Sequence, residues 1–176
     1  MIPLVLCAVL GVGEAAEPTE SRRGSEPDSL VGVFRFSESP VETAGIGEQI
    51  EAAIATMDFF IRPLARYRLK QLTKPAAQFT FEPMAGGVRV VNEWVSRPCR
   101  FDGGANQFKN RLGKEMQSVC TPLSNGIRED FVGLASGTWS HAFRLASDGT
   151  TLVQAVVVKS PDLGRPLEYT VTYARE

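Results

Sequence analysis

The sequence predicts a mainly β protein: a closed, antiparallel, up-and-down barrel of about eight to ten strands, with a two-helix cap inserted after the first strand. Three observations lead to this fold class. Of the 176 residues, 43% are hydrophobic and 22% are charged, which is typical of a single globular core. A helical period occurs only within residues 46–72. From residue 79 onward, β-branched and aromatic segments alternate with glycine-containing turns.

The first 29 residues are expected to lie outside the barrel domain, which we assign to residues 30–176. Residues 2–13 carry no charge and have the length of a signal-peptide apolar region, too short to cross a bilayer. Residues 1–15 therefore predict a signal peptide cleaved before Ala16, and hence a periplasmic or secreted protein. A buried N-terminal strand of a cytosolic protein is the alternative. Residues 16–29 are poor in apolar side chains and predict a disordered linker.

One strand and two helices are expected next. Residues 31–36 are β-branched and aromatic, and turn-forming residues follow them. Apolar side chains then recur at steps of three and four, which predicts an amphipathic helix of about four turns. This stripe consists of Ile46, Ile50, Ile54, Met57, Ile61 and Leu64. Pro63 lacks a backbone N–H, so we expect a kink or break there and a second short helix through Leu72.

The rest of the chain predicts strands joined by tight turns. The expected strands are 79–81, 88–95, 115–121, 127–134, 138–145, 151–159 and 167–175. The stretch 97–123 divides least clearly. Asn125-Gly126 and Asp148-Gly149 supply the positive φ that hairpin turns need, so the strands should meander antiparallel. Closure into a barrel would remove the two free sheet edges, and its interior would be filled or would hold one small ligand.

Two cysteines remain once the signal peptide, with Cys7, is set aside. Cys99 and Cys120 form an even pair in a chain that we expect to enter an oxidising space, so we predict a disulfide between them. Such a bridge would close a loop of about twenty residues and stabilise the fold by roughly 3 kcal/mol. Two reduced, buried thiols are the alternative.

The order of the elements resembles the fatty-acid-binding-protein branch of the lipocalin-like calycin superfamily, in which a helix pair closes one mouth of the barrel. Residues 148–154 and 167–175 are also similar to the last hairpin of those proteins. In them an Arg and a Tyr two positions apart on the last strand commonly hold a ligand carboxylate. Here the order is inverted, as Tyr173-Ala174-Arg175. Separately, residues 62–69 and 160–169 resemble a group of secreted bacterial proteins with no assigned activity, which favours export.

The last strand and one earlier strand supply candidate ligand contacts. Alternation places Tyr169, Tyr173 and Arg175 on one face of the last strand, and this face is the better candidate for the interior. Hydroxyls and one cation inside an apolar chamber suit an amphipathic ligand. Arg175 fraying into solvent is the alternative. Trp139 and His141 share one face of the strand 138–145 and are candidates for the same interior.

His141 is the only histidine, and it does not predict a metal site. A zinc ion needs three or four ligands, and no His, Cys or Glu with suitable spacing accompanies this residue. We therefore expect no metal and no cofactor, and favour a core or rim histidine. A haem held by one histidine, which occurs in relatives of this barrel class, is the minor alternative.

A cluster of basic residues lies in the second helix. The cluster consists of Arg62, Arg66, Arg68, Lys70 and Lys74. We favour solvated cations near a helix C-terminus, where the helix dipole stabilises them. The alternative is contact with a membrane surface or a ligand anion at the barrel mouth, and Arg66 is its first candidate.

The function predicted from these features is reversible binding of a hydrophobic or amphipathic, lipid-like molecule inside an exported barrel. The sequence contains no Gly-x-Ser-x-Gly elbow, no phosphate-binding glycine loop with Lys and no thiol–histidine signature, so we predict no enzyme activity. The net charge of −1 disfavours nucleic-acid binding. A filled barrel that serves as an envelope interaction protein is the alternative, and a barrel enzyme ranks third.

Overall fold

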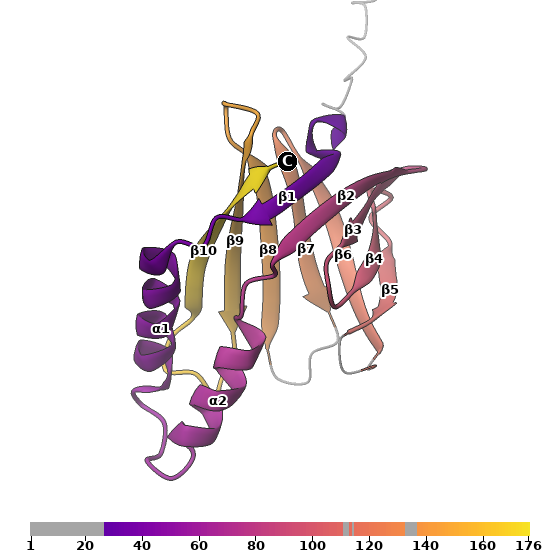
Figure 1. Ribbon diagram of the computed structural model, residues 1–176. Coiled ribbons are helices and arrows are strands. Elements are labelled where there is room, and N and C mark those ends of the chain that lie inside the picture. The colour runs from indigo at the N-terminus through magenta and orange to yellow at the C-terminus, as the bar shows by residue number, and fades with distance from the viewer. Residues whose placement is uncertain (1–26, 111–112, 114, 133–136) are drawn as a thin grey trace, which may run out of the picture.

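Ten antiparallel strands curve around one interior in the computed structural model, which describes residues 27–110, 113, 115–132 and 137–176 (Figure 1). The strands are β1 Gly32–Phe36, β2 Gln78–Met84, β3 Gly87–Val91, β4 Ser96–Arg100, β5 Ala105–Lys109, β6 Glu115–Leu123, β7 Gly126–Val132, β8 Thr138–Leu145, β9 Thr151–Lys159 and β10 Leu167–Arg175. The helices α1 Pro40–Ile54 and α2 Arg62–Leu72 follow β1. This architecture confirms the predicted fold class.

The sheet follows the chain from neighbour to neighbour. Its order is β4-β3-β2-β1-β10-β9-β8-β7-β6-β5. Strand β1 connects the N-terminal strands to the C-terminal strands by pairing with β2 and with β10. The end strands β4 and β5 share no backbone ladder among the described residues, so the barrel is nearly closed, with one seam. The sequence analysis missed both of these strands.

Side chains close the seam between β4 and β5. A disulfide joins Cys99 on β4 to Cys120 on β6, with their Cα atoms 5.4 Å apart, which confirms the predicted bridge. The amide of Arg100 donates a hydrogen bond to Asn106 Oδ1 on β5 at 3.2 Å. A covalent bond to β6 and a polar contact to β5 therefore hold β4 across the seam, where the described residues of β4 and β5 form no backbone ladder.

The turn before β4 corrects a predicted strand boundary. The sequence analysis extends one strand from residue 88 to residue 95, whereas β3 ends at Val91. Asn92 Oδ1 accepts hydrogen bonds from the amides of Trp94 and Val95 at 3.0 and 2.9 Å. An Asn side chain that satisfies the following amides in this way stabilises a turn in place of an extended strand.

Helix α1 starts earlier than the apolar stripe predicts. The side chain of Ser39 caps it by accepting a hydrogen bond from the amide of Glu42 at 3.3 Å, and Pro40 occupies the first turn. Ser and Pro at these positions are typical of a helix start. The Glu42 carboxylate also accepts hydrogen bonds from the amide and hydroxyl of Thr172, which attaches α1 to β10.

Helix α1 also ends earlier than predicted, at Ile54, so the predicted stripe does not belong to one helix. The Arg62 side chain folds back and donates to the carbonyls of Ala55 and Met57, each at 2.7 Å. These bonds satisfy carbonyls that a continuing helix would have used. Ile61 and Leu64, predicted on the buried stripe, are about half exposed as a result. The expected second helix is present, with Pro63 in its first turn.

The N-terminal predictions fall largely outside the described residues. The predicted signal peptide, residues 1–15, and residues 16–26 of the predicted linker belong to that part of the chain. Residues 27–29 form a short 3-10 helix with Leu30, whose side chain is buried in the core. None of the helices among the described residues combines the length and the apolar run that a bilayer crossing requires.

Aromatic side chains fill one half of the barrel. Phe79 lies 5.0 Å from Phe143 and 5.2 Å from Tyr173 between ring centroids, and Phe81 lies 5.9 Å from Phe34 and 5.4 Å from Phe143. All five rings are almost fully buried. Edge-to-face contacts at these distances add to the free energy of burying the rings. We call the part of the barrel that these five rings fill the packed half, and it bounds one side of the cavity described below.

Candidate functional site

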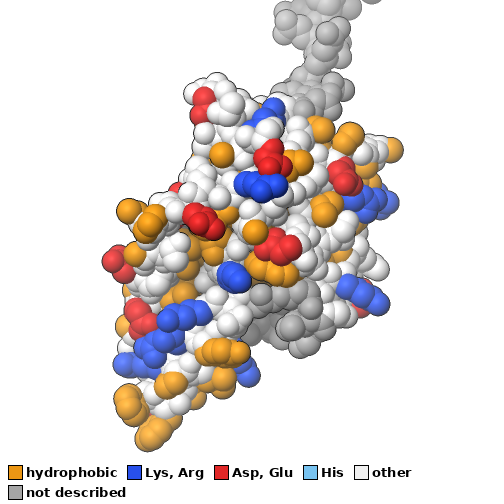
Figure 2. All heavy atoms as spheres, viewed as in Figure 1, with side chains coloured by type: hydrophobic (Ala, Val, Ile, Leu, Met, Phe, Trp, Pro, Cys, Tyr) orange, Lys and Arg blue, Asp and Glu red, His pale blue; other side chains and the backbone are white. Residues whose placement is uncertain are grey.

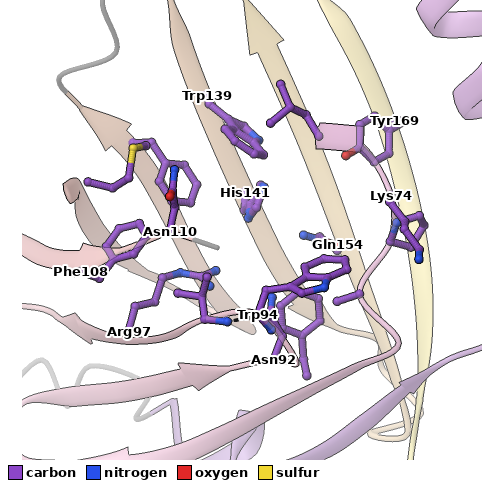
Figure 3. A pocket seen from close by; sticks show the side chains of 17 residues that line it. Lys74, Asn92, Trp94, Arg97, Phe108, Asn110, Trp139, His141, Gln154 and Tyr169 are labelled. Atoms are coloured by element: carbon purple, nitrogen blue, oxygen red, sulfur yellow. Dashed lines mark hydrogen bonds between the residues drawn. The ribbon is translucent and has the colours of Figure 1, made fainter. Parts of the chain in front are cut away.

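A cavity of about 140 Å³ occupies the other half of the barrel (Figure 3). Leu72 at the end of α2, together with Lys74 and Pro75, forms one side of it. Strand β2, strands β4 to β10 and the turn before β4 supply most of the rest. Phe79 belongs to both the cavity wall and the packed aromatic half, so the cavity starts where that packing stops.

Aromatic rings form much of the cavity wall. The ring of Phe131 on β7 lies 5.3 Å from Trp139, 5.0 Å from His141 and 6.0 Å from Phe108 between centroids. Trp139 and His141 are 5.3 Å apart and project from the same face of β8 (Figure 3). Contacts of this kind hold the rings in place, so the wall is formed before any ligand arrives.

A buried ion pair stands beside these rings. Arg97 on β4 donates to both carboxylate oxygens of Glu129 on β7, with N–O distances of 2.7, 2.8 and 2.9 Å. The side chains are 4% and 0% exposed. The guanidinium also lies 5.8 Å from the ring centroid of Phe108 and 5.9 Å from that of Phe131, within cation–π range. Burial alone would raise the pKa of Glu129, but Arg97 holds that pKa below its ordinary value.

Two ring nitrogens at the cavity are buried without a hydrogen-bond partner: Trp139 Nε1 and His141 Nδ1. Burial lowers the pKa of His141 to about 3, although Glu129 opposes the shift, so the imidazole is neutral at pH 7. Burial also raises the pKa of the Tyr169 phenol, which therefore stays protonated. Figure 3 shows the Tyr169 hydroxyl directed into the cavity. The cavity thus combines apolar walls with uncharged hydrogen-bonding groups.

The structure brings three of the predicted ligand contacts together. Trp139, His141 and Tyr169 all line the cavity, and they come from the strand faces that alternation assigned to the interior. Tyr173 is also inside the barrel, but in the packed half. Its hydroxyl donates a hydrogen bond to Oε1 of Gln154 at 3.1 Å, and Gln154 lines the cavity.

The two predicted arginine contacts lie away from the cavity. Arg175 donates to the carbonyl of Ser29, and its guanidinium lies 4.9 Å from the ring centroid of Phe34, in the packed half. Arg66 pairs with Glu51 of α1 at 2.5 and 2.7 Å on the outer surface. Neither residue lines the cavity. The partners of Arg175 lie in the packed half of the barrel, and the partner of Arg66 lies on the helix surface.

The haem alternative does not fit the residues present. The imidazole of His141 packs between the rings of Phe131, Trp139 and Phe143, at centroid distances of 5.0 to 5.8 Å. The space of about 140 Å³ beside it is much smaller than a porphyrin. Over the part of the chain that the structure describes, no three His, Cys, Asp or Glu residues are grouped to hold a metal ion.

The sequence analysis missed Arg97, which lines the cavity, and its buried partner Glu129. A local signal existed for Glu129, because alternation along β7 places it on the same face as Ile127 and Phe131, and all three are buried. Arg97 offered no such signal. Its strand was not predicted, and its partner is 32 residues away in the sequence.

Comparisons with known proteins agree on the fold. No family model and no curated protein matches the chain. Among solved structures, it is similar to zebrafish ileal bile acid-binding protein complexed with cholic acid, at 6% identity and a TM-score of 0.54 over 84% of this chain and 99% of that chain. It is also similar to apo lipid binding protein 8 of Caenorhabditis elegans, at 10% identity and a TM-score of 0.50 over 85% and 96%. The chain therefore has the same type of barrel fold as these binding proteins.

Proposed function

We propose that the protein binds a hydrophobic or amphipathic small molecule, part of which occupies the open half of the barrel. The observation that carries the proposal is the aromatic-walled cavity of about 140 Å³. Moving apolar groups from water into such a space lowers the free energy. An engineered apolar cavity of about 150 Å³ in another protein binds benzene. The cavity therefore suits one ring or a short alkyl segment, and a longer tail would extend past Leu72 and Lys74.

The two structural neighbours add support. One neighbour is a complex with cholic acid, and the other is called a lipid binding protein. Both are related to this chain by fold, at 10% identity or less. The second candidate function is a barrel that acts through its outer surface without a ligand, and the packed aromatic half favours it. We propose binding without a catalytic step.

The two tryptophans offer a direct test. Trp94 and Trp139 are the only tryptophans in the chain, and both line the cavity. Titration with alkylbenzenes, from toluene upward, should change their fluorescence. Because each buried methylene contributes about 0.8 kcal/mol, affinity should rise roughly fourfold per carbon. The rise should stop once the alkyl chain outgrows the cavity, whereas adsorption to the outer surface would show no such limit.

A pair of matched variants localises the binding. Val95→Phe should lower the affinity, because Val95 lines the cavity and a larger side chain would fill it. Val132→Phe is the control, since Val132 is 38% exposed at the end of β7 and lies outside the cavity lining. Absence of any fluorescence change, together with no uptake in native mass spectrometry, would favour the ligand-free barrel.

We also propose that the helix pair contacts a membrane surface through the helix tip, which we define as Phe59, Phe60, Ile61 and Leu64. Phe59 is 74% exposed and Phe60 is 86% exposed, which is unusual for such large apolar side chains. Figure 2 shows apolar side chains gathered at this tip, with Lys and Arg side chains beside them. Apolar groups flanked by cations suit an anionic bilayer surface.

Vesicle sedimentation tests this contact. The protein should sediment with vesicles that contain anionic lipid and less with purely zwitterionic ones. The double variant Phe59→Ser and Phe60→Ser should lose most of this binding. Val41→Ser is the control, because Val41 is 81% exposed at the other end of α1. Equal loss in both variants would contradict a contact through the helix tip.

Export to the periplasm or the medium is part of the same proposal. The Cys99–Cys120 disulfide supports it, because disulfides persist in oxidising compartments and are rare in the cytosol. Protein recovered from the periplasm or medium should begin near Ala16, as N-terminal sequencing would show. Cytosolic protein that retains Met1 and carries reduced Cys99 and Cys120 would contradict export.

A further inference from the structure

We propose that the part of the ligand inside the cavity carries an uncharged hydrogen-bonding group, such as a hydroxyl or carbonyl, and that the cavity discriminates against a carboxylate. This inference rests on the proposed function and specifies the class of ligand. It follows from two features of the described cavity residues: how their charges are paired, and which polar atoms lack a partner.

Of the two cations that line the described cavity, one is paired with a buried carboxylate and the other lies at the rim. Among the described lining residues, Arg97 and Lys74 are the only cations. Arg97 binds both oxygens of Glu129 through Nε and Nη2 at 2.7 to 2.9 Å, so the buried pair has no net charge. Lys74 is exposed, in the segment after α2. The predicted interior cation, Arg175, lies in the packed half.

A carboxylate inside the cavity would therefore be a second buried anion near Glu129. One guanidinium would then serve two carboxylates, and the second anion would exchange its hydration for neutral hydrogen-bond donors alone, with no positive charge of its own. Neutral His141, opposite Glu129 in the β7–β8 register, supplies no compensating positive charge. The arrangement disfavours an acid head group inside the barrel on electrostatic grounds.

The unpartnered atoms point to an uncharged group instead. Trp139 Nε1 is a donor only, and a neutral imidazole Nδ1 either donates or accepts. Both atoms are buried without partners, and their rings lie side by side on β8 (Figure 3). A hydroxyl can accept from Trp139 and also serve His141 in either tautomer, whereas an alkyl group leaves both atoms unsatisfied. The hydroxyl of Tyr169 is directed into the same space.

Three single-ring probes of matched size test the inference by isothermal titration calorimetry at pH 7: toluene, benzyl alcohol and benzoate. The measurements use Lys74→Gln, which removes the exposed rim cation. We expect benzyl alcohol to bind at least about tenfold more tightly than benzoate. In the same background, Trp139→Phe should lose roughly fivefold to tenfold more affinity for benzyl alcohol than for toluene.

The outcomes separate this inference from the proposed function. Benzoate binding as tightly as benzyl alcohol would overturn the inference and leave the function standing. So would equal losses for toluene and benzyl alcohol in Trp139→Phe, because the two nitrogens would then not select the polar group. Toluene binding in that variant shows that its cavity is intact. Failure of all three probes to bind the protein would overturn the proposed function itself.

Discussion

The guanidinium of Arg97 on β4 holds both carboxylate oxygens of Glu129 on β7, and both side chains are almost completely removed from solvent. The pair bridges the seam where β4 and β5 share no ladder among the described residues. Removing one partner of a buried pair leaves the other charge without compensation, which costs more than the net contribution of the intact pair.

Arg97→Met should therefore destabilise the protein by about 3–5 kcal/mol in urea unfolding. The double variant Arg97→Met and Glu129→Leu should be clearly more stable than Arg97→Met, because no charge is then left buried. Arg128→Met, next to Glu129 on β7, is the control, since the pair of Arg128 with Asp130 is exposed and should contribute less than about 1 kcal/mol. A loss in Arg97→Met as small as in the control would refute this account.

The Cys99–Cys120 disulfide should contribute about 3 kcal/mol of stability, as expected for a closed loop of 21 residues. The double variant Cys99→Ser and Cys120→Ser should unfold at lower urea concentration by that amount. Reductant should shift the wild-type transition to the same midpoint and leave the variant unaffected. A shift in the variant would mean that the reductant acts elsewhere.

Stability should depend on pH through His141, whose pKa burial lowers from 6.5 to about 3. At pH 7 the imidazole is neutral in both the folded and the unfolded state. As the pH falls from 6.5 to 3, the unfolded chain binds a proton that the folded protein does not. The free energy of unfolding should then fall by about 1.4 kcal/mol per pH unit, or several kcal/mol over this interval.

His141→Phe tests the origin of that slope. The variant should show little change in the free energy of unfolding between pH 6.5 and 4.5. Below about pH 4.5 both proteins should lose stability, because protonation of Glu129, whose pKa Arg97 lowers, breaks the ion pair. An identical slope in wild type and variant above pH 4.5 would assign the effect to other groups.

Replacement of two glycines with alanine should change the stability of the protein in opposite directions. A methyl group on Gly126 would overlap the backbone carbonyl of Phe143 on β8, so Gly126→Ala should cost roughly 1–3 kcal/mol. A methyl group on Gly47, within α1, would meet no atom within 4 Å, and Gly47→Ala should stabilise by about 0.5–1 kcal/mol. Thermal unfolding of the two variants should show shifts of opposite sign.

Alternation and turn residues in the sequence predicted those strands whose pairing is set by neighbouring hairpin turns. Strands β8, β9 and β10 were predicted with their observed bounds, because their residues alternate and hairpin turns separate them. Strand β4 contains Pro98 and two arginines, and it was missed because its burial depends on the disulfide and on Glu129. The end of α1 was misplaced for a similar reason, since the Arg62 side chain supplies its capping bonds.

Alternation predicted which way side chains point but not how deep they lie. Tyr169 and Arg175 share a face of β10, and that face is the interior. Six residues of strand span roughly 20 Å, so the first lies at the cavity and the second lies near Phe34 in the packed half. Which half is filled depends on rings from β1, β2 and β8 that meet only in the folded barrel.

Because of the seam between β4 and β5, the chain could begin and end at a different point of the barrel without any change in which strands pair. Strands β1 and β10 are paired, and the amide of Glu176 donates to the carbonyl of Val33 at 3.0 Å. A circular permutant could therefore join residue 176 to residue 30 through a short linker and open the chain within residues 102–104. All nine strand pairings would be retained, and the Cys99–Cys120 bridge would tether one of the two new ends.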